Sequence, residues 1–296
     1  MSSSCNYIKF RYTKGLCNNL FKLFTAVRIA EVEGKQLVEP VFKWGRKPAV
    51  QFSDIYDLGF FNTHMRVGNK PMVVLENELD SALVDDRSLT YDLWKGSRNI
   101  YDLRHQRAHN RIPRNCPSVR VLRALKIHPQ YQPLLDAQPG LNAIHVRWEW
   151  EWIGHAQKRQ PGLPPDETML VPPEDIAAMY ATQHNTPAFF TTGAGHNDVQ
   201  TTFSRHNIDT TYFYDSVLAY DINAAVNFAI CVNAPLFIGN SRSTFSNLIA
   251  LARHLENSGP SYIYNYQGRF MLRTDAGLHF EGPKVVQEQV VVEDRL

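Results

Sequence analysis

The 296-residue sequence has few cysteines, little net charge and no long apolar run. Its four cysteines are scattered and form neither a CxxC pair nor a metal-ligand spacing, which favours reduced thiols over a disulfide framework or a zinc site. The net charge of +2 gives no reason to expect nucleic acid as a partner. No segment is long enough to span a bilayer, and the first residues lack the apolar core of a signal peptide, so we expect a cytoplasmic protein.

Two nucleotide-binding fingerprints are also missing. No GxGxxG follows a predicted strand, and no P-loop lysine motif occurs, so a nicotinamide-dependent oxidoreductase and P-loop phosphoryl transfer lose most of their support. No convincing DxD-type metal site is present either. The acidic pair Asp85-Asp86 lies in a region without a clear pattern, and we expect it at the surface. The sequence therefore predicts neither a metal ion nor another bound cofactor.

In the second half of the chain, short apolar runs typical of strands alternate with segments in which apolar residues recur with a helical period. The predicted strands are 188–191, 211–214 and 236–240, and the predicted helices are 174–183, 198–206, 221–230 and 244–255. Such alternation is typical of a parallel sheet covered on both faces, as in a Rossmann-type domain. The polar segment Gly154–Pro173, which holds five prolines, is expected to be a long loop.

The first residues predict a strand, a turn, a helix and a second strand. Tyr7–Tyr12 has the apolar character of a strand, and Gly15–Asn19 is expected to turn the chain. Apolar residues then recur with a helical period from Leu20, Gly34 ends the helix, and Leu37–Phe42 is the next strand. A turn that meets a helix N-terminus can bind anions through free backbone N–H groups, although an ordinary connection capped by asparagine has the same pattern.

The middle of the first half is less informative. Residues 45–115 mix short apolar runs with polar segments, and the basic stretch Arg104–Arg111 is expected to be a solvated helix face rather than an acceptor surface. Ser118–Ile127 is predicted to be helical. The proline-rich residues 128–140 are the candidate hinge. We therefore expect an N-terminal domain at 1–135 and a C-terminal domain at 136–296, with a C-terminal segment that can return to the first domain.

The most informative segment is Asn142–Arg147, a short apolar strand that ends in His145 and Arg147. Ligands of open α/β sheets bind outside the carboxyl ends of the strands, and the planar fork of arginine suits a phosphate. The alternative is an arginine in a surface salt bridge beside a core histidine. A later segment, Phe237–Ser246, is a strand that leads into a helix N-terminus rich in hydroxyl groups.

Three segments together resemble the GDP-fucose-dependent fucosyltransferases, which include protein O-fucosyltransferases and α-1,6-fucosyltransferases. They are the early turn Gly15–Phe21, the strand end His145–Arg147 and the late segment Phe237–Ser246. The resemblance implies the GT-B fold, an α/β architecture of two Rossmann-like domains facing a cleft. It implies an acceptor-side first domain and a donor-binding second domain. The implied reaction is an inverting, metal-independent transfer of a fucosyl residue from GDP-fucose to a glycan or another hydroxyl acceptor.

The resemblance also implies a role for individual residues. Arg147 would hold the β-phosphate of the donor, and Asn18 would lie near the sugar and the acceptor. The other implied donor-binding residues are Gly15, His145, Ser243, Thr244 and Phe245. Asn227 takes the place of an aspartate that reads guanine in the family. That difference keeps another nucleotide sugar open as the donor.

The tryptophan-rich segment after Arg147 contains the candidates for the general base. Strand alternation would place Arg147, Glu149 and Glu151 on one face, and Glu149 is favoured as the base because it is closer to Arg147. The family commonly has an aspartate shortly after its His-x-Arg, and Trp150 stands near that place here. A catalytically silent GT-B protein that binds sugars or nucleotides is therefore the alternative to a glycosyltransferase.

Overall fold

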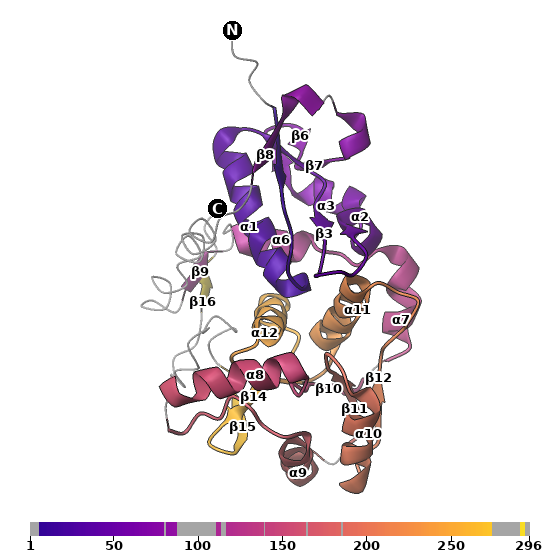
Figure 1. Ribbon diagram of the computed structural model, residues 1–296, viewed down its shortest axis with the longest axis vertical. Helices are drawn as coiled ribbons and strands as arrows, with labels where there is room; N and C mark the ends of the chain where they lie inside the picture. The colour runs from indigo at the N-terminus through magenta and orange to yellow at the C-terminus, as the bar shows by residue number, and fades with distance from the viewer. Residues whose placement is uncertain are drawn as a thin grey trace. The chain divides into compact units, whose positions relative to one another are not determined.

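The computed structural model describes residues 6–79, 81–87, 111–113, 117–138, 140–163, 165–184, 186–273 and 291–293 (Figure 1). The chain divides into two compact units. The first comprises Met1–Gln132, Asp215–Ala225 and Val291–Leu296, and the second comprises Pro133–Tyr214 and Val226–Val290. Most of the basic stretch from Arg104, as well as Cys5 and Cys116, lies outside the described residues.

The first unit is built on a four-stranded parallel sheet in the order β7-β2-β1-β8. Its strands are β1 (Tyr7–Phe10), β2 (Gln36–Val38), β7 (Val73–Val74) and β8 (Val84–Arg87). The long helix α1 (Leu16–Glu33) connects β1 to β2 and buries its apolar stripe, and Gly34 ends it with a left-handed φ of 65°. This confirms the predicted strand–helix–strand unit.

The start of α1 differs from the expectation. Residues 16–19 are helical rather than a turn, and Gly15 is the N-cap. Leu16 and Cys17 are buried, and burial of two apolar side chains outweighs the capping preference of asparagine, which is about 1 kcal/mol. Asn19 caps nothing within the helix, because its side chain donates to the carbonyl of Lys14 and accepts from the Lys14 N–H.

The predicted second strand is also interrupted. Val38 ends β2, and Val41–Phe42 forms β3, which pairs with β4 (Val50–Gln51) in a separate two-stranded sheet. Pro40 lies between them and has no N–H to donate to a ladder, which explains the break. The remaining elements of this unit are α2 (Phe52–Ile55), α3 (Leu58–His64), β5 (Arg66–Val67), β6 (Lys70–Pro71), α6 (Pro117–Ala124), three 3₁₀ turns (Glu76–Glu78, Ser81–Leu83 and Pro129–Tyr131), and the pair β9 (Arg111–Pro113) with β16 (Val291–Glu293).

The second unit contains a six-stranded sheet in the order β12-β11-β10-β13-β14-β15. Its strands are β10 (Asn142–His145), β11 (Ala188–Thr191), β12 (Thr210–Tyr212), β13 (Phe237–Gly239), β14 (Ser261–Tyr266) and the antiparallel edge strand β15 (Arg269–Leu272). The five parallel strands follow the Rossmann order. The chain places β11 and β12 on one side of the first strand, β10, and then crosses to the other side, where the fourth strand, β13, pairs with β10. The position between β10 and β13 is therefore the reversal of the sheet. The predicted Rossmann-like character of this half is confirmed.

Helices cover both faces of this sheet. The cluster of Ile144, Phe190 and Ile238 packs against α9 (Pro173–Gln183) and α10 (His196–Arg205). On the other side lie α11 (Tyr220–Asn233) and α12 (Thr244–Glu256), as Figure 1 shows. The remaining helical segments are α7 (Gln132–Asp136), α8 (Trp150–Arg159) and the 3₁₀ turn Gln160–Gly162.

The expected loop at Gly154–Pro173 is partly wrong, because α8 continues to Arg159. Trp152 and Ala156, four residues apart, are buried on one side of α8 and pack against Met169. That small apolar cluster stabilises a helix whose other positions are exposed or partly exposed. Only the residues after α8 form a connection, which leads to α9.

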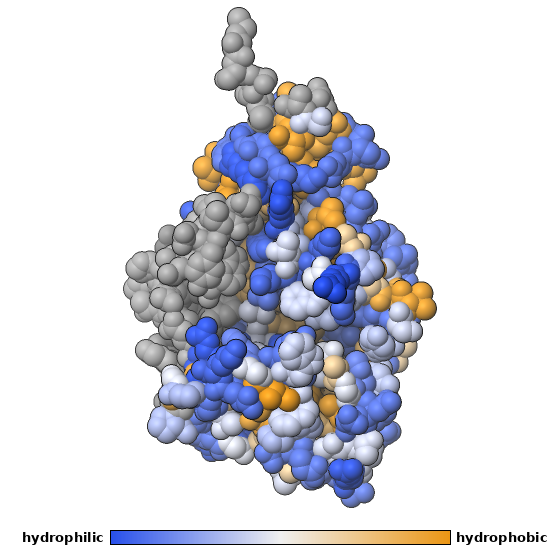
Figure 2. Space-filling model, in the orientation of Figure 1, coloured by the Kyte–Doolittle hydropathy of each residue, from blue (hydrophilic) through white to orange (hydrophobic). Residues whose placement is uncertain are grey.

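None of the helices in the described part of the chain combines the length and apolar character that a membrane span needs. On the face shown in Figure 2, hydrophilic residues cover most of the described surface, and hydrophobic ones gather in separate patches.

Candidate functional site

The two strands at the reversal of the second sheet end side by side. β10 and β13 pair in parallel, with Ala143 opposite Phe237 and Ile144 opposite Ile238. The residues that follow each strand therefore emerge at the same edge. Crevices at such a reversal bind ligands in open α/β sheets, because the connections after the two strands diverge to opposite faces. Here those residues are Val146–Glu149, which follow His145 at the end of β10, and Asn240–Phe245.

Arg147 is the centre of this edge. One terminal nitrogen donates to Ser243 Oγ at 3.1 Å, and the other forms an ion pair with Glu149 Oε1 at 2.5 Å. The guanidinium carbon lies 4.1 Å from the centre of the Trp152 ring, in a cation–π contact. The backbone N–H of Arg147 donates to the hydroxyl of Tyr264 at 3.3 Å. The start of α8 and the residue before α12 thus hold the guanidinium, and Tyr264 of β14 holds the backbone of Arg147.

Three buried polar atoms around Arg147 have no hydrogen-bond partner among the described residues. They are Arg147 Nε, Glu149 Oε2 and Trp152 Nε1. A buried polar group without a partner is costly, by about 1–3 kcal/mol, and in folded proteins such groups are normally satisfied by water or a ligand. Two of the three atoms are N–H donors, so the edge can bind the oxygens of an anion.

Glu149 does not share a strand face with Arg147 and Glu151, and that part of the sequence prediction is wrong. β10 ends at His145, and Glu149 is the N-cap of α8. Glu149 is packed against Gly193, where an added Cβ would lie 3.2 Å from its carboxyl carbon, whereas Glu151 is exposed in the first turn of α8. The change from strand to helix at residues 146–150 removes the period of two on which the expectation depended.

His145 is buried behind Arg147. Its Nδ1 lies 2.7 Å from Ser246 Oγ, and its ring lies 4.7 Å from the ring of Phe245, so it contacts α12. Burial, followed by the positive charge of Arg147, lowers the pKa of His145 well below its usual value. A neutral imidazole in this position holds the helix against the end of β10 and adds no charge of its own.

Ser243 begins α12 as its N-cap, and Thr244 and Phe245 form the first turn. The side chain of Ser243 makes no capping hydrogen bond and accepts from Arg147 instead. Because the N-terminal amides of a helix carry partial positive charge, α12 and Arg147 together favour an anion at this edge. His145, Arg147, Glu149, Ser243 and Phe245 are therefore brought together, as the sequence implied.

Asn227 belongs to the second unit and lies in α11. It is buried, and its side-chain nitrogen donates to the carbonyl of Phe213 at 3.1 Å. Gly15 and Asn18 belong to the first unit. Gly15 packs beneath the rings of Trp44 and Tyr220, and the partly buried Asn18 is the third residue of α1.

Sequence reasoning missed Trp152, Tyr264 and the pair Glu167–Arg242. The four-residue spacing of Trp152 and Ala156 is a helical signal that could have placed Trp152 on a buried face. No local pattern indicates Tyr264, because it lies 117 residues after the backbone N–H that it accepts from. Among the described residues, no group of three or more His, Cys, Asp or Glu side chains is arranged to hold a metal ion.

Gly239, the last residue of β13, allows α12 to approach the sheet. A Cβ on Gly239 would lie 2.5 Å from Ser246 Oγ and 2.9 Å from the ring of Phe237. We expect Gly239→Ala to lower the free energy of unfolding by about 1–3 kcal/mol, because α12 must move away from the strand. Denaturant unfolding measures the loss.

The matched control for this substitution is Gly154→Ala in α8, where an added Cβ meets nothing within 4 Å. It should raise the free energy of unfolding by about 0.5–1 kcal/mol, since alanine is the better helix former. Equal stability of the two variants would contradict the close approach of α12 to β13.

No family model matches this sequence, and no curated protein matches it either. Solved structures do. The structure of POFUT1 in complex with GDP-fucose has a TM-score of 0.58 at 14% identity, over 88% of this chain and 98% of that chain. POFUT1 in complex with GDP has a TM-score of 0.56 at 13% identity, over 89% and 99%. The fucosyltransferase NodZ from Bradyrhizobium has a TM-score of 0.48 at 13% identity, over 90% and 98%.

The chain has a fold similar to that of POFUT1. The predicted likeness to fucosyltransferase structures and the predicted GT-B class, with two Rossmann-like α/β domains, are confirmed. At such low identity the likeness concerns the fold. The chemistry has to be argued from the residues around Arg147.

Proposed function

We propose that this protein is a glycosyltransferase that moves a fucosyl residue from GDP-fucose to a hydroxyl group of a glycan. The observation that supports it most is Arg147, held at the reversal of the second sheet with a buried Nε that has no partner among the described residues. POFUT1, whose fold is similar, has been crystallised with GDP and with GDP-fucose. The proposed donor is therefore a nucleoside diphosphate sugar, and the reaction is inverting and metal-independent.

The proposed chemistry follows from where charge develops. Transfer breaks the bond between the anomeric carbon and the β-phosphate oxygen, and the electron pair of that bond stays with the departing diphosphate. Arg147 Nε and the first amides of α12 are donors that can bind that oxygen and stabilise its charge. The hydroxyl of Ser243 and the ring of Trp152 keep the guanidinium in one orientation, so little reorganisation is needed during the reaction.

Glu149 is proposed to orient Arg147. Its Oε1 lies 2.5 Å from Arg147, whereas Nε of the same guanidinium is left for a ligand. A phosphate can therefore bind without displacing the carboxylate. A general base must instead reach the proton of the acceptor hydroxyl, whereas Oε1 of Glu149 is already in contact with Arg147.

Glu149→Gln separates these two roles. If Glu149 orients Arg147, the variant should lose both affinity for GDP and rate of transfer, by about tenfold each, because a neutral amide holds the guanidinium less firmly. Calorimetry with GDP and transfer assays with GDP-fucose measure the two quantities. Unchanged GDP affinity together with a large loss of transfer would instead establish Glu149 as the base.

A nucleotide ranking tests the proposed function. GDP, UDP, ADP and dTDP, alone and as sugar conjugates, are compared by thermal shift in EDTA, and GDP-fucose is then incubated with glycan acceptors while free GDP is measured. We expect GDP and GDP-fucose to give the largest shifts and transfer to continue in EDTA. Activity that is lost in EDTA and restored by Mn²⁺ or Mg²⁺ would contradict metal independence.

Asn227 motivates the second candidate donor. An asparagine amide cannot offer guanine the two acceptor oxygens of a carboxylate, and its nitrogen is held by the carbonyl of Phe213. A preference for UDP or dTDP in the ranking would support a different nucleotide sugar. Binding of GDP-fucose with neither transfer nor hydrolysis would support a catalytically silent binding protein.

A further inference from the structure

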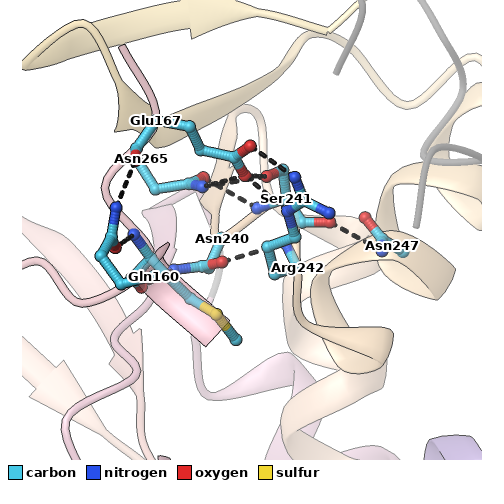
Figure 3. A network of polar contacts seen from close by, with 8 residues as sticks. Gln160, Glu167, Asn240, Ser241, Arg242, Asn247 and Asn265 are labelled. Atoms are coloured by element: carbon cyan, nitrogen blue, oxygen red, sulfur yellow. Dashed lines mark hydrogen bonds and ion pairs between the residues drawn. The ribbon is translucent and has the colours of Figure 1, made fainter. Parts of the chain in front are cut away.

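A buried polar network lies next to the Arg147 site, where the connection after α8 meets the loop after β13 (Figure 3). Its residues come from three distant parts of the second unit: Gln160 and Glu167, Asn240–Arg242 with Asn247, and Asn265. None of these residues is among the donor-binding residues of the proposed function. Polar groups are costly to bury unless they are fully paired. A fully paired network of this size holds the segments that contribute to it in fixed positions.

Glu167 is the centre of the network. Its side chain is 0% exposed, and its two oxygens accept from Arg242 Nε at 2.6 Å and from a terminal nitrogen of Arg242 at 2.5 Å. Ser241 Oγ and Asn265 Nδ2 each donate to the same carboxylate at 3.3 Å. The carboxylate therefore accepts four hydrogen bonds from three residues, and the forked contact sets the orientation of Arg242 as well as its distance.

The loop Asn240–Ser243 is fixed by these partners along its whole length. The backbone N–H of Ser241 donates to Asn265 Oδ1 at 2.9 Å, and the backbone N–H of Arg242 donates to Asn240 Oδ1 at 3.0 Å. Asn247, one turn into α12, donates to the Ser241 carbonyl at 2.9 Å. The next residue in the loop, Ser243, is the hydroxyl partner of Arg147.

A second route leads from the same connection to the other side of Arg147. Asn240 Nδ2 donates to the carbonyl of Met169 at 3.0 Å, and the Met169 side chain packs against Trp152. The indole of Trp152 is the ring that lies against the Arg147 guanidinium. Gln160 ties the connection down, because its amide donates to the Glu167 carbonyl and accepts from the Met169 N–H, each at 2.8 Å.

We propose that Glu167 is a positioning residue for the anion site. Through Arg242 it fixes the loop that presents Ser243, and through Met169 the same connection fixes the ring of Trp152. The contacts of the guanidinium with Ser243 and with Trp152 are then in place before a ligand binds. The proposal rests on the proposed function only in that the ligand is a nucleoside diphosphate.

A merely structural ion pair would behave differently. Removal of one partner of a buried pair destabilises a protein, but replacement of both partners by apolar residues of similar volume often restores stability. The double variant Glu167→Met/Arg242→Met keeps the volume and removes the contacts to Ser241 and Asn265. A positioning role therefore predicts that the double variant recovers its melting temperature but not its ligand affinity.

The experiment compares wild type, Glu167→Gln, the double variant and the control Glu33→Gln. Glu33 also accepts a forked contact from an arginine, Arg87, at 2.6 and 2.8 Å, but it lies in the first unit. Each protein is measured for melting temperature, for GDP affinity by calorimetry, and for hydrogen exchange of the amides of residues 243–247 without ligand.

We expect Glu167→Gln to lose melting temperature and to bind GDP about tenfold more weakly, the effect of one lost charge-assisted hydrogen bond. The double variant should regain melting temperature, keep the tenfold loss of affinity, and exchange the amides of 243–247 faster. Glu33→Gln should match wild type in affinity and in that exchange. Recovery of both stability and GDP affinity in the double variant would overturn the proposal and leave a structural ion pair.

Failure of the proposed function gives a different result. If wild type binds none of the tested nucleotides, the proposed function fails, and the exchange of 243–247, measured without ligand, still decides whether Glu167 positions the loop. Unchanged exchange at 243–247 in both Glu167 variants would overturn the positioning role whatever the ligand is.

Discussion

Arg147→Ala is expected to lower the rate of transfer by a factor of about a hundred to a thousand while the fold persists. Arg147 contacts both Ser243, at the start of α12, and Glu149, at the start of α8, and its Nε, which has no partner among the described residues, is a donor for the departing phosphate. Loss of one donor that stabilises developing charge typically costs about 10²–10³ in rate. The measurement is kcat and KM for GDP-fucose with a saturating glycan acceptor.

Two controls separate chemistry from stability. Arg147→Ala leaves Glu149 buried without its partner, so the double variant Arg147→Ala/Glu149→Gln should be more stable than the single one and equally inactive. Arg147→Lys should also be slow, because an ammonium cannot contact Ser243, Glu149 and a phosphate with one planar fork. Near-normal turnover of Arg147→Ala would remove Arg147 from the mechanism.

The part of the site on the second sheet was implied by the family resemblance of His145–Arg147 and Phe237–Ser246, and the topology explains it. Parallel strands bring their carboxyl ends to one edge, and β10 and β13 are neighbours in the sheet, so His145–Arg147 and Ser243–Phe245, almost a hundred residues apart, meet there. Strand and helix signals in that half are strong, because apolar runs are short and turn residues separate them.

The errors arose where burial overrides a local preference. Asn18 and Asn19 favour a cap or turn, but Leu16 and Cys17 are buried, and α1 begins at Leu16. The segment after Arg147 alternates in the manner of a strand, yet a helix places Trp152 against Ala156 and Met169. Local preferences of about 1 kcal/mol lose to the burial of a whole apolar side chain.

The polar support of the site could not be predicted at all. Glu167 and Arg242 are 75 residues apart, and Asn265 lies still further along the chain. Glutamate is a charged residue that is usually exposed, and nothing in its proline-rich connection indicates otherwise. Only the folded structure shows that the side chain of Glu167 is buried. Hydrogen bonds between residues far apart in the chain produce no periodic sequence pattern from which they could be predicted.

Arg253→Met is expected to lower the free energy of unfolding by about 3–5 kcal/mol, the largest loss of stability predicted for a single substitution in this protein. Arg253 lies in the last turn of α12 and is 0% exposed. Its guanidinium donates to Ser261 Oγ and to six backbone carbonyls, those of Cys231, Val232, Ala234, Pro235, Ser258 and Pro260. The carbonyls of Cys231 and Val232 belong to the last turn of α11, and the other four belong to the connections that lead into β13 and β14.

The size of that loss depends on the carbonyls that are left behind. Burial lowers the pKa of Arg253 to about 10, so the protein already bears a desolvation cost for this cation, and the contacts with the carbonyls and with Ser261 offset it. Methionine fills the volume but leaves the buried carbonyls without donors. Arg253→Lys should recover only part of the stability, because an ammonium has three donors and cannot reach all six carbonyls.

Denaturant unfolding followed by tryptophan fluorescence measures both variants, with Arg205→Met as the control. Arg205 also lies in the last turn of a helix, α10, but it is exposed, so its loss should change the free energy of unfolding by less than about 0.5 kcal/mol. A loss below about 1 kcal/mol for Arg253→Met would mean that water or a backbone shift satisfies the carbonyls, and that these connections do not depend on the guanidinium. A loss of the expected size would show that one side chain holds β13 and β14 in place, and with them the strand end from which Ser243 faces Arg147.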